Sequence, residues 1–301
     1  MSIRRFAVLL CAEDSDYVRT KYGGYFGIFK EMLAAPGEEW HVFRASRQEL
    51  PRDETEIRLY DGFVITGSCS DAHGDDPWIR DLLVLLRKLD SMEKKVLGIC
   101  FGHQILGRAL GGKVGRAKSW DIGLRPVNLS TTSAFLSSLM IPQVLSVIQC
   151  HRDEVKEMPP NVEVVARSDK TGIEMFRFGD HIMGIQGHPE YTIDILLHLI
   201  DRLLQRTLIT VCMYYEITST MLFGLSLTPS FGYVIPGIVC RCPEGGYRGV
   251  CAGQGGMEEA LHHLPQGNPI AILPARHFRI LFQIQPQEER GRNYGSFHGL
   301  R

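Results

Sequence analysis

The sequence predicts an α/β fold: a three-layer sandwich in which helices cover both faces of a central, mostly parallel sheet. Short apolar runs at 6–11, 62–66 and 96–99 are typical of strands that are buried on both faces. Segments at 25–33 and 79–89 carry apolar residues at helical spacing and lie between these runs. An alternation of strand and helix favours parallel strands joined by helical crossovers, and this favours the α/β class.

Taken in order, the remaining elements continue this pattern. A helix opens at Asp76 and Pro77, because Asp is a favoured cap and Pro is favoured at the first helical position. Gly111 ends a helix predicted at 103–110, and extended structure begins at Lys113. The other predicted elements are strands at 40–43, 145–150, 162–166, 173–178 and 182–186, a polar turn at 151–155 and a helix at 191–208.

A strand-to-helix corner at Cys100 is the most informative feature of the chain. Gly98 and Gly102 lie two residues to either side of it, as a sharp, strained turn of the nucleophile-elbow kind requires. The corner also places the sulfur at a helix N-terminus, where free N–H groups favour thiolate over thiol. The alternative interpretation is an inert core cysteine, since free Cys is often simply buried.

A candidate general base lies downstream of the cysteine. His188 is suited to take the thiol proton and to return a proton to a leaving amine. Glu190 points to the same side of an extended segment and can hold the imidazole in one tautomer. Pro189 between them restricts the backbone. The pattern predicts a triad of Cys100, His188 and Glu190.

Two stretches carry a family resemblance: Gly-Ile-Cys-Phe-Gly-His-Gln at 98–104 and Gln-Gly-His-Pro-Glu at 186–190. They resemble the triad motifs of the class I glutamine amidotransferase family, and the resemblance covers 4–206. Within this family the chain is most similar to the plant cytosolic gamma-glutamyl peptidases, which process glutathione conjugates. The resemblance implies a flavodoxin-like fold and a small gamma-glutamyl substrate.

The resemblance also implies an oxyanion hole and a glutamyl pocket. In the family, the loop that matches Gly67 and Ser68 supplies one oxyanion amide, and the residue that matches Phe101 supplies the other. The residue that matches Gln104 contacts the glutamyl group of the substrate. Without the triad, these residues would be interpreted as an ordinary turn and a helix-surface amide.

Two further segments match family positions near the substrate. The loop of Ser119 and Trp120 is implied to contact the amino-acid part of the substrate, although Trp120 could also be a packing aromatic. His151 and Asp153 match a His-x-Asp pattern beside the glutamyl pocket and form a rival His–acid pair. The Gly-His-Pro-Glu context favours His188 as the base, so His151 is kept as a pocket residue.

The composition of the chain argues against nucleic acid and membranes as binding partners. With 33 basic and 34 acidic residues, the net charge of −1 gives no electrostatic footprint for nucleic acid or an anionic membrane. No apolar run reaches the length of a membrane span, and the start of the chain is interpreted as a strand and not as a signal peptide. Eight scattered cysteines favour a reduced, cytosolic protein. The predicted chemistry needs no cofactor, and no protein partner can be assigned.

The composition changes near residue 211, which divides the chain into an amidotransferase-like domain, 1–210, and an atypical tail, 211–301. The tail contains 13 Gly and 7 Pro but no Lys and no Asp. One hypothesis is translated non-coding sequence, such as a retained intron. The alternative is a small metal-binding domain with Cys240, Cys242, Cys251 and His262 or His263 as ligands, although this spacing is weak for zinc.

These observations predict a cysteine-nucleophile hydrolase that cleaves gamma-glutamyl amides, with glutathione S-conjugates as the expected substrates. Three alternatives remain at this point. A glutaminase subunit that passes ammonia to a separate synthase would share every motif. A secreted folate-type gamma-glutamyl hydrolase shares the chemistry but should carry a signal peptide. A non-enzymatic binding protein on the same fold should show a broken triad.

Overall fold

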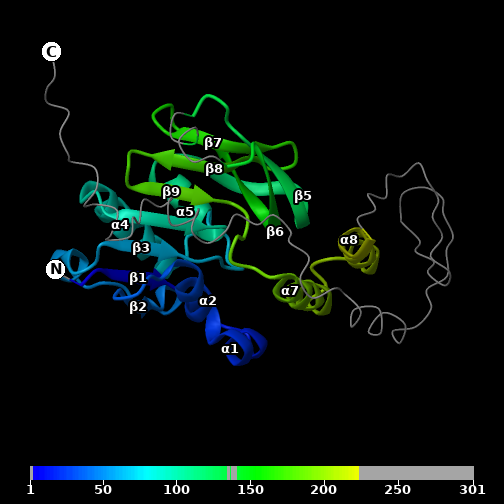
Figure 1. Cartoon of the computed structure of the whole chain (residues 1–301), viewed down its shortest axis with the longest axis horizontal. Helices are drawn as coiled ribbons and strands as arrows, with labels where there is room; N and C mark the ends of the chain where they lie inside the picture. The colour runs from blue at the N-terminus through cyan, green and yellow to red at the C-terminus, as the bar shows by residue number, and fades with distance from the viewer. Residues whose placement is uncertain (1–2, 134–135, 137–140, 224–301) are drawn as a thin grey trace, which may run out of the picture. The chain divides into compact units, whose positions relative to one another are not determined.

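The computed structural model describes residues 3–133, 136 and 141–223 (Figure 1). Within these limits the chain forms two compact units. The first contains 3–121 and 126–190, and the second contains 122–125 and 191–223. The sequence interpretations of 224–301, including the metal-binding alternative, lie outside the described residues.

The first unit is built on a 9-stranded sheet of order β2-β1-β3-β4-β9-β8-β7-β5-β6. The strands are β1 (Arg5–Leu9), β2 (Glu39–Phe43), β3 (Gly62–Ile65), β4 (Lys95–Ile99), β5 (Lys113–Leu129), β6 (Val144–Glu157), β7 (Glu163–Ser168), β8 (Gly172–Phe178) and β9 (Ile182–Ile185). Its helical segments are α1 (Asp16–Tyr22), α2 (Gly24–Leu33), η1 (Ala45–Arg47), α3 (Glu54–Arg58), α4 (Pro77–Ser91) and α5 (Phe101–Ala109).

Helices cover both faces of this sheet, as the three-layer prediction requires. Phe29 and Leu33 of α2 pack in one buried cluster with Val8 and Val64. Alternate residues of the same strands belong to a second cluster, with the apolar residues of α4 and α5. Because successive strand residues point to opposite faces, the two clusters are the two sides of one sheet. The α/β class is confirmed.

The prediction of a mostly parallel sheet needs correction. Strands β2, β1, β3, β4 and β9 pair in parallel. From β9 onward the strands pair antiparallel, through β8 and β7 to β5. The antiparallel half contains the longest strands, β5 with 17 residues and β6 with 14. Short turns join β7 to β8 and β8 to β9, and a short turn can only join antiparallel neighbours.

The predicted polar turn at 151–155 is also wrong, because β6 continues through it to Glu157. The buried residues Gln149, His151, Asp153 and Val155 alternate with more exposed neighbours, which is the two-residue period of a half-buried strand. A strand is recognised in a sequence by alternating apolar and polar residues. Here several of the buried residues are themselves polar, so the sequence shows no such alternation.

Local sequence and packing together explain α4, which covers one face of the sheet. Pro77 is at the first position of α4, as predicted, but the Asp76 side chain makes no capping hydrogen bond. The apolar stripe predicted at 79–89 is buried. The helix therefore depends on packing and on the fixed backbone angle of proline, and not on its cap.

The second unit contains α7 (Ile193–Gln205) and α8 (Val211–Phe223). The helix predicted at 191–208 is therefore present with shorter ends, and Ile195, Leu196 and Ile200 are buried as expected. Of the tail predicted at 211–301, the structure describes only α8. The interpretation of the tail stays a prediction.

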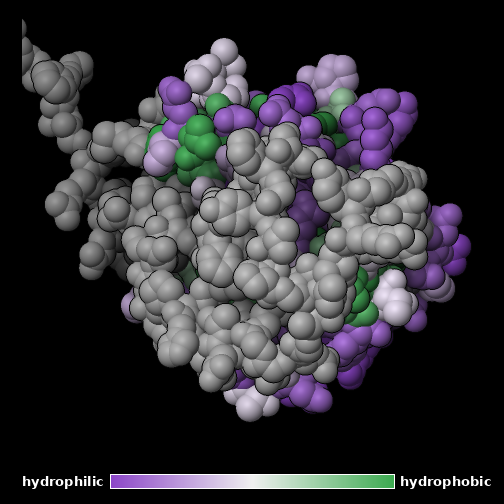
Figure 2. All heavy atoms as spheres, turned by 90° about the vertical axis from the view of Figure 1, so that its right-hand side faces the viewer, coloured by the Kyte–Doolittle hydropathy of each residue, from purple (hydrophilic) through white to green (hydrophobic). Residues whose placement is uncertain are grey.

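No helix in the described part of the chain is long and apolar enough to cross a membrane. In the space-filling view of one face, the coloured residues around the grey region are mostly hydrophilic, with small hydrophobic areas between them (Figure 2).

Candidate active site

The site is built at the end of β4, where the chain turns sharply into α5. Cys100 occupies the turn with φ 54° and ψ −104°, a left-handed conformation that few non-glycine residues adopt. Its N–H donates to Ile185 O at 2.9 Å, and its carbonyl accepts from Gln104 N at 3.0 Å. Strain of this kind persists only where surrounding structure enforces it, and it occurs often at reactive residues. The predicted nucleophile elbow has formed.

The two flanking glycines are required by close backbone contacts. A Cβ at Gly98 would lie 2.4 Å from Gly102 O, and a Cβ at Gly102 would lie 2.3 Å from Ile65 O. Both obstacles are backbone atoms that cannot rotate away. The spacing of the glycines around Cys100 therefore reflects how tightly α5 is packed against β3 and β4.

His188 and Glu190 follow β9, the strand that pairs with β4, and so lie beside Cys100. His188 Nδ1 hydrogen-bonds Glu190 Oε1 at 2.8 Å, and both residues are buried. Gly67 lies against the pair: a Cβ there would be 3.0 Å from His188 Cε1 and 3.7 Å from Cys100 Cβ. Because Nδ1 is occupied by the carboxylate, Nε2 is the nitrogen left to exchange a proton with the sulfur.

The electrostatics of the group favour a protonated His188. Burial alone lowers the pKa of His188, but the charges of Cys100 and Glu190, and hydrogen bonds to both, outweigh it and raise the pKa to about 10. A protonated His188 beside Cys100 stabilises a thiolate, which is the nucleophilic form of cysteine. The arrangement can therefore carry out acyl transfer through a thioester.

The predicted oxyanion residues flank the sulfur. Phe101 is buried at the start of α5 and stacks on Trp78, with ring centroids 5.4 Å apart. Ser68 uses its hydroxyl within its own loop, donating to Cys11 O at 2.7 Å and accepting from Ser70 N at 3.1 Å. The Ser68 hydroxyl thus stabilises the loop that presents Gly67.

Gln104 is buried one turn into α5 and points away from solvent. Its amide nitrogen donates to Asp153 O at 2.8 Å and to Gln186 Oε1 at 3.1 Å. These two bonds fix which end of the amide is which, and they leave the oxygen Oε1 as the group available to a ligand.

The rival His–acid pair does not form. His151 Nδ1 donates to the backbone oxygen of Asp153 at 2.9 Å, and not to its carboxylate. The Asp153 carboxylate is instead held by Arg116 at 2.8 Å and by His73 at 3.2 Å. Burial lowers the pKa of His151 to about 4, so its imidazole is neutral at pH 7. This geometry supports the preference for His188 as the base.

Asp71, His73 and Asp153 offer ligand atoms that all lie within 4.8 Å of one another, a spacing that could hold a metal ion. Arg116 already pairs with both carboxylates, each at 2.8 Å. A guanidinium in this position neutralises the charge that would attract a cation, so we assign no metal to this group. Sequence reasoning missed the cluster, because Asp153 on β6 is far along the chain from the loop of Asp71 and His73.

The Ser119–Trp120 segment lies on β5 and not in a loop. Ser119 is exposed and Trp120 is half-buried. The Arg152 guanidinium lies over the Trp120 ring, 6.0 Å from its centroid. The structure therefore places Trp120 beside β6, next to the segment of His151.

A buried polar cluster behind the site was not predicted. Glu174 accepts from Gln149 Nε2 at 2.9 Å and from Ser168 Oγ at 2.5 Å. Burial raises the pKa of Glu174 to about 6. Gln149 Nε2 lies 2.9 Å from where a Cβ of Gly187 would be, so the cluster supports the segment that leads to His188. Buried polar side chains in strands are a signal for such clusters, but the sequence does not show which partners they find.

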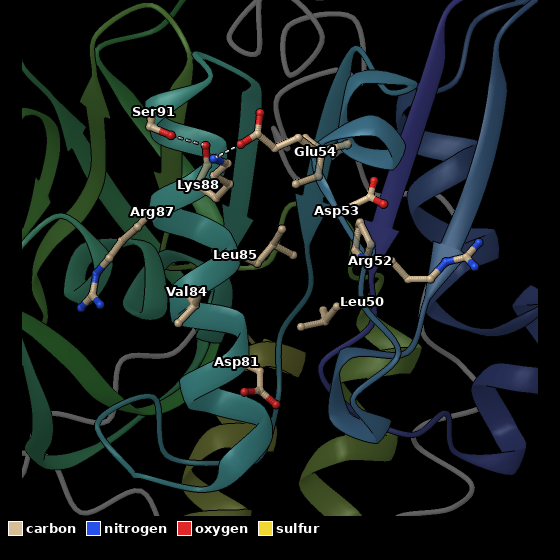
Figure 3. Close-up of a pocket in the computed structure, with 12 residues that line it drawn as sticks. Leu50, Arg52, Asp53, Glu54, Asp81, Val84, Leu85, Arg87, Lys88 and Ser91 are labelled. Carbon is tan, nitrogen blue, oxygen red and sulfur yellow. Dashed lines mark hydrogen bonds and ion pairs between the residues drawn. The ribbon is translucent and has the colours of Figure 1, made fainter.

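A cavity of about 670 Å³ lies elsewhere, between α4 and the segment that includes α3 (Figure 3). Leu50, Val84 and Leu85 lie between its charged margins, where Lys88 pairs with Glu54. None of its lining residues belongs to the group around Cys100. We therefore place the candidate chemistry at the elbow and not in this cavity.

Comparisons with known proteins point to one family. The model of the glutamine amidotransferase class-I family matches residues 24–196. Gamma-glutamyl peptidase 5 of Arabidopsis thaliana is 50% identical over 204 residues, which are 66% of this chain and 80% of that protein. Gamma-glutamyl peptidase 3 of the same plant is 45% identical over 210 residues, 68% of this chain and 84% of that protein.

Solved structures show the same fold. A glutamine amidotransferase from Methylobacillus flagellatus has a TM-score of 0.55 and 23% identity, and the match covers 69% of this chain and 76% of that one. A glutamine amidotransferase from Thermotoga maritima has a TM-score of 0.55 and 22% identity, with 72% of this chain and 90% of that one covered. At this level of identity the likeness concerns the fold alone.

Proposed function

Because the chain belongs to the class I glutamine amidotransferase family, we propose that it is a hydrolase that cleaves the gamma-glutamyl amide bond of glutathione S-conjugates and related gamma-glutamyl peptides. The observation that carries the proposal is the placement of His188 against Cys100 with Glu190 on its other nitrogen. The naming of the Arabidopsis relatives as gamma-glutamyl peptidases supports the substrate class.

In the proposed reaction, the Cys100 thiolate attacks the gamma-carbonyl carbon of the substrate, and the carbonyl π electrons move to oxygen. The N–H groups of Gly67 and Phe101 hold this oxyanion, an arrangement in which one donor contributes about 3 kcal/mol. The tetrahedral intermediate collapses, the C–N bond breaks, and His188 gives its proton to the departing amine. A thioester between Cys100 and the glutamyl group remains.

Hydrolysis of the thioester completes the cycle. His188, now neutral, takes a proton from water as the water oxygen attacks the thioester carbon. The second tetrahedral intermediate expels the Cys100 thiolate and releases glutamate. Glu190 holds the His188 ring in one orientation through both steps. Every proton and electron pair is supplied by the protein, the substrate and water, so the reaction needs no cofactor.

The test is glutamate release by the purified chain from a glutathione S-conjugate and, separately, from glutamine. We expect cleavage of the conjugate to exceed that of glutamine and to disappear in Cys100→Ala. Cys69→Ala, which changes an exposed cysteine in the neighbouring loop, is the matched control and should keep full activity. Release from glutamine alone would instead assign a glutaminase subunit that supplies a separate synthase.

The proposal includes a cytosolic location. Cys11, Cys69, Cys100, Cys150 and Cys212 are free thiols in the described part of the chain, which supports a reducing compartment. Fractionation of cells that express a tagged full-length chain tests this, and recovery in a membrane or secreted fraction would contradict it.

A further inference from the structure

The more exposed face of β6 leads outward from the candidate nucleophile. His188 N donates to Ile148 O at 2.7 Å, so β6 passes directly beside the base. Two residues on is the half-buried Cys150, whose thiol pKa is raised to about 12 by burial and then by the charge of Cys100. Arg152 is on the same face as Cys150, because side chains of a strand alternate.

Arg152 is an exposed cation that is held in place but not neutralised. Its guanidinium lies 6.0 Å from the Trp120 ring centroid, a cation–π contact that restrains the side chain. Within the described part of the chain it pairs with no carboxylate. Nearby cations differ: Arg116 pairs with Asp71 and Asp153, and Lys156 pairs with Glu154. A restrained guanidinium without an acidic partner is suited to bind a carboxylate from a ligand.

The spacing suits the leaving part of a gamma-glutamyl tripeptide. A strand rises about 3.4 Å per residue, so Arg152 lies about 14 Å along β6 from Ile148, whose carbonyl accepts the hydrogen bond from His188 N. In an extended gamma-glutamyl tripeptide, two residues follow the scissile amide, and they span at most about 7 Å. A leaving group of this length covers about half of the distance along β6 from the base to Arg152, and the long Arg152 side chain can extend toward its terminal carboxylate.

We propose that Arg152 binds the terminal carboxylate of the leaving peptide and so sets specificity for gamma-glutamyl peptides over simple gamma-glutamyl amides. Trp120 is a positioning residue that holds the guanidinium for this contact. The inference rests on the proposed function and assigns the leaving-group side of that same site. Arginine is favoured over lysine here, because its planar group forms two parallel hydrogen bonds to a carboxylate.

The experiment compares two substrates that differ in one charge: gamma-glutamyl-S-benzylcysteinylglycine and the same peptide with a C-terminal carboxamide. We expect the full-length chain to prefer the free carboxylate. In Arg152→Gln, kcat/KM for the carboxylate peptide should fall by about tenfold to a hundredfold, mainly through KM, while kcat/KM for the carboxamide stays the same. For the carboxylate peptide, kcat/KM of Arg152→Lys should lie between the values of the unchanged chain and of Arg152→Gln. Trp120→Leu should lower the preference for the carboxylate peptide without removing it.

Arg87→Gln is the matched control, since Arg87 is an exposed arginine on α4 that lines the separate cavity. Its selectivity should equal that of the unchanged chain. The role of Arg152 is refuted if the unchanged chain does not prefer the carboxylate, or if Arg152→Gln slows both peptides equally. Failure of the unchanged chain to cleave either peptide would overturn the proposed function itself, and the Arg152 proposal with it.

Discussion

Gly102→Ala tests whether the close packing of the elbow controls the reaction. The added Cβ would lie 2.3 Å from Ile65 O, whereas carbon–oxygen contacts in proteins begin at about 3.3 Å. Ile65 is the last residue of β3, directly before the loop of Gly67, and its carbonyl is fixed by the sheet. The start of α5 must therefore move by about 1 Å away from β3.

A shift of this size separates the two proposed oxyanion donors, because Phe101 moves with α5 while Gly67 stays with β3. A misplacement of about 1 Å at a reacting centre can cost on the order of a hundredfold in rate. Overpacking of this kind costs about 1–3 kcal/mol of unfolding free energy, which is less than the stability of a typical domain. Gly102→Ala should therefore fold and yet lose most of its activity.

The assay is glutamate release together with urea unfolding of the same preparation. Gly115→Ala is the control, because its Cβ would meet nothing within 4 Å, and it should keep full activity. Gly102→Ala with more than half of the normal rate would show that the contact to Ile65 O does not position the elbow, and the argument would be wrong.

Three further predictions concern the charges of the site. In Glu190→Gln, loss of the carboxylate lowers the pKa of His188, so the alkaline limb of kcat/KM, expected near pH 10, should move to lower pH in a pH–rate profile. Because the pKa of His188 in the folded chain is above its ordinary value of 6.5, its protonation stabilises the fold fully below about pH 6.5, and this contribution is lost as the pH rises through about 10. Urea unfolding should show that loss in the unchanged chain and not in His188→Gln. The raised pKa of Glu174, about 6 against 4.5, has a consequence of the same sign at lower pH: the unchanged chain should lose on the order of 2 kcal/mol relative to Glu174→Gln as the pH rises from 4.5 to above 6.

Each of these predictions has an outcome that contradicts it. An alkaline limb that stays in place in Glu190→Gln would remove the carboxylate from the account of the His188 pKa. Parallel unfolding curves for His188→Gln and the unchanged chain between pH 7 and 10 would mean that the imidazolium contributes no stability. A constant difference between Glu174→Gln and the unchanged chain across pH 4.5–7 would mean that Glu174 titrates normally.

The features that the sequence predicted well depend on short segments. The apolar run 96–99 is a strand because nearly every side chain in it is buried, and the glycines around Cys100 mark the elbow because no other residue fits. His188 and Glu190 are two residues apart on one extended segment, so their contact is also local. Each of these features is set by a few neighbouring residues, and a short stretch of sequence records it.

Short polar helices were missed although their end signals are present. Ser15 caps α1 by accepting from Val18 N, and Gly23 ends it with φ 70°. Asp53 caps α3 by accepting from Glu56 N at 2.9 Å. These helices have 7 and 5 residues and few apolar positions, so hydrophobic period gives no signal. Only the capping residues signal these two helices in the sequence.

Contacts between distant segments could not be predicted at all. Arg116 on β5 reaches Asp153 on β6 and Asp71 in the loop after β3, because these three segments meet in space. The Arg152–Trp120 contact likewise requires that β5 and β6 are neighbours, and their polar sequences give no register. The same absence of apolar alternation that made 151–155 resemble a turn concealed a strand whose buried face carries His151 and Asp153.

The sheet separates the bond-breaking chemistry from the choice of leaving group. In the parallel half, β3 and β4 create the elbow, and the hydrogen bond from Cys100 N to Ile185 O joins it to β9, which leads to His188. The antiparallel half supplies β5 and β6, which carry Trp120 and Arg152 on a more exposed face. Exchanges on that face change no contact within the triad, whereas exchanges at the elbow move the nucleophile. Specificity for the leaving peptide can therefore vary through Arg152 and Trp120 while Cys100, His188 and Glu190 keep one geometry.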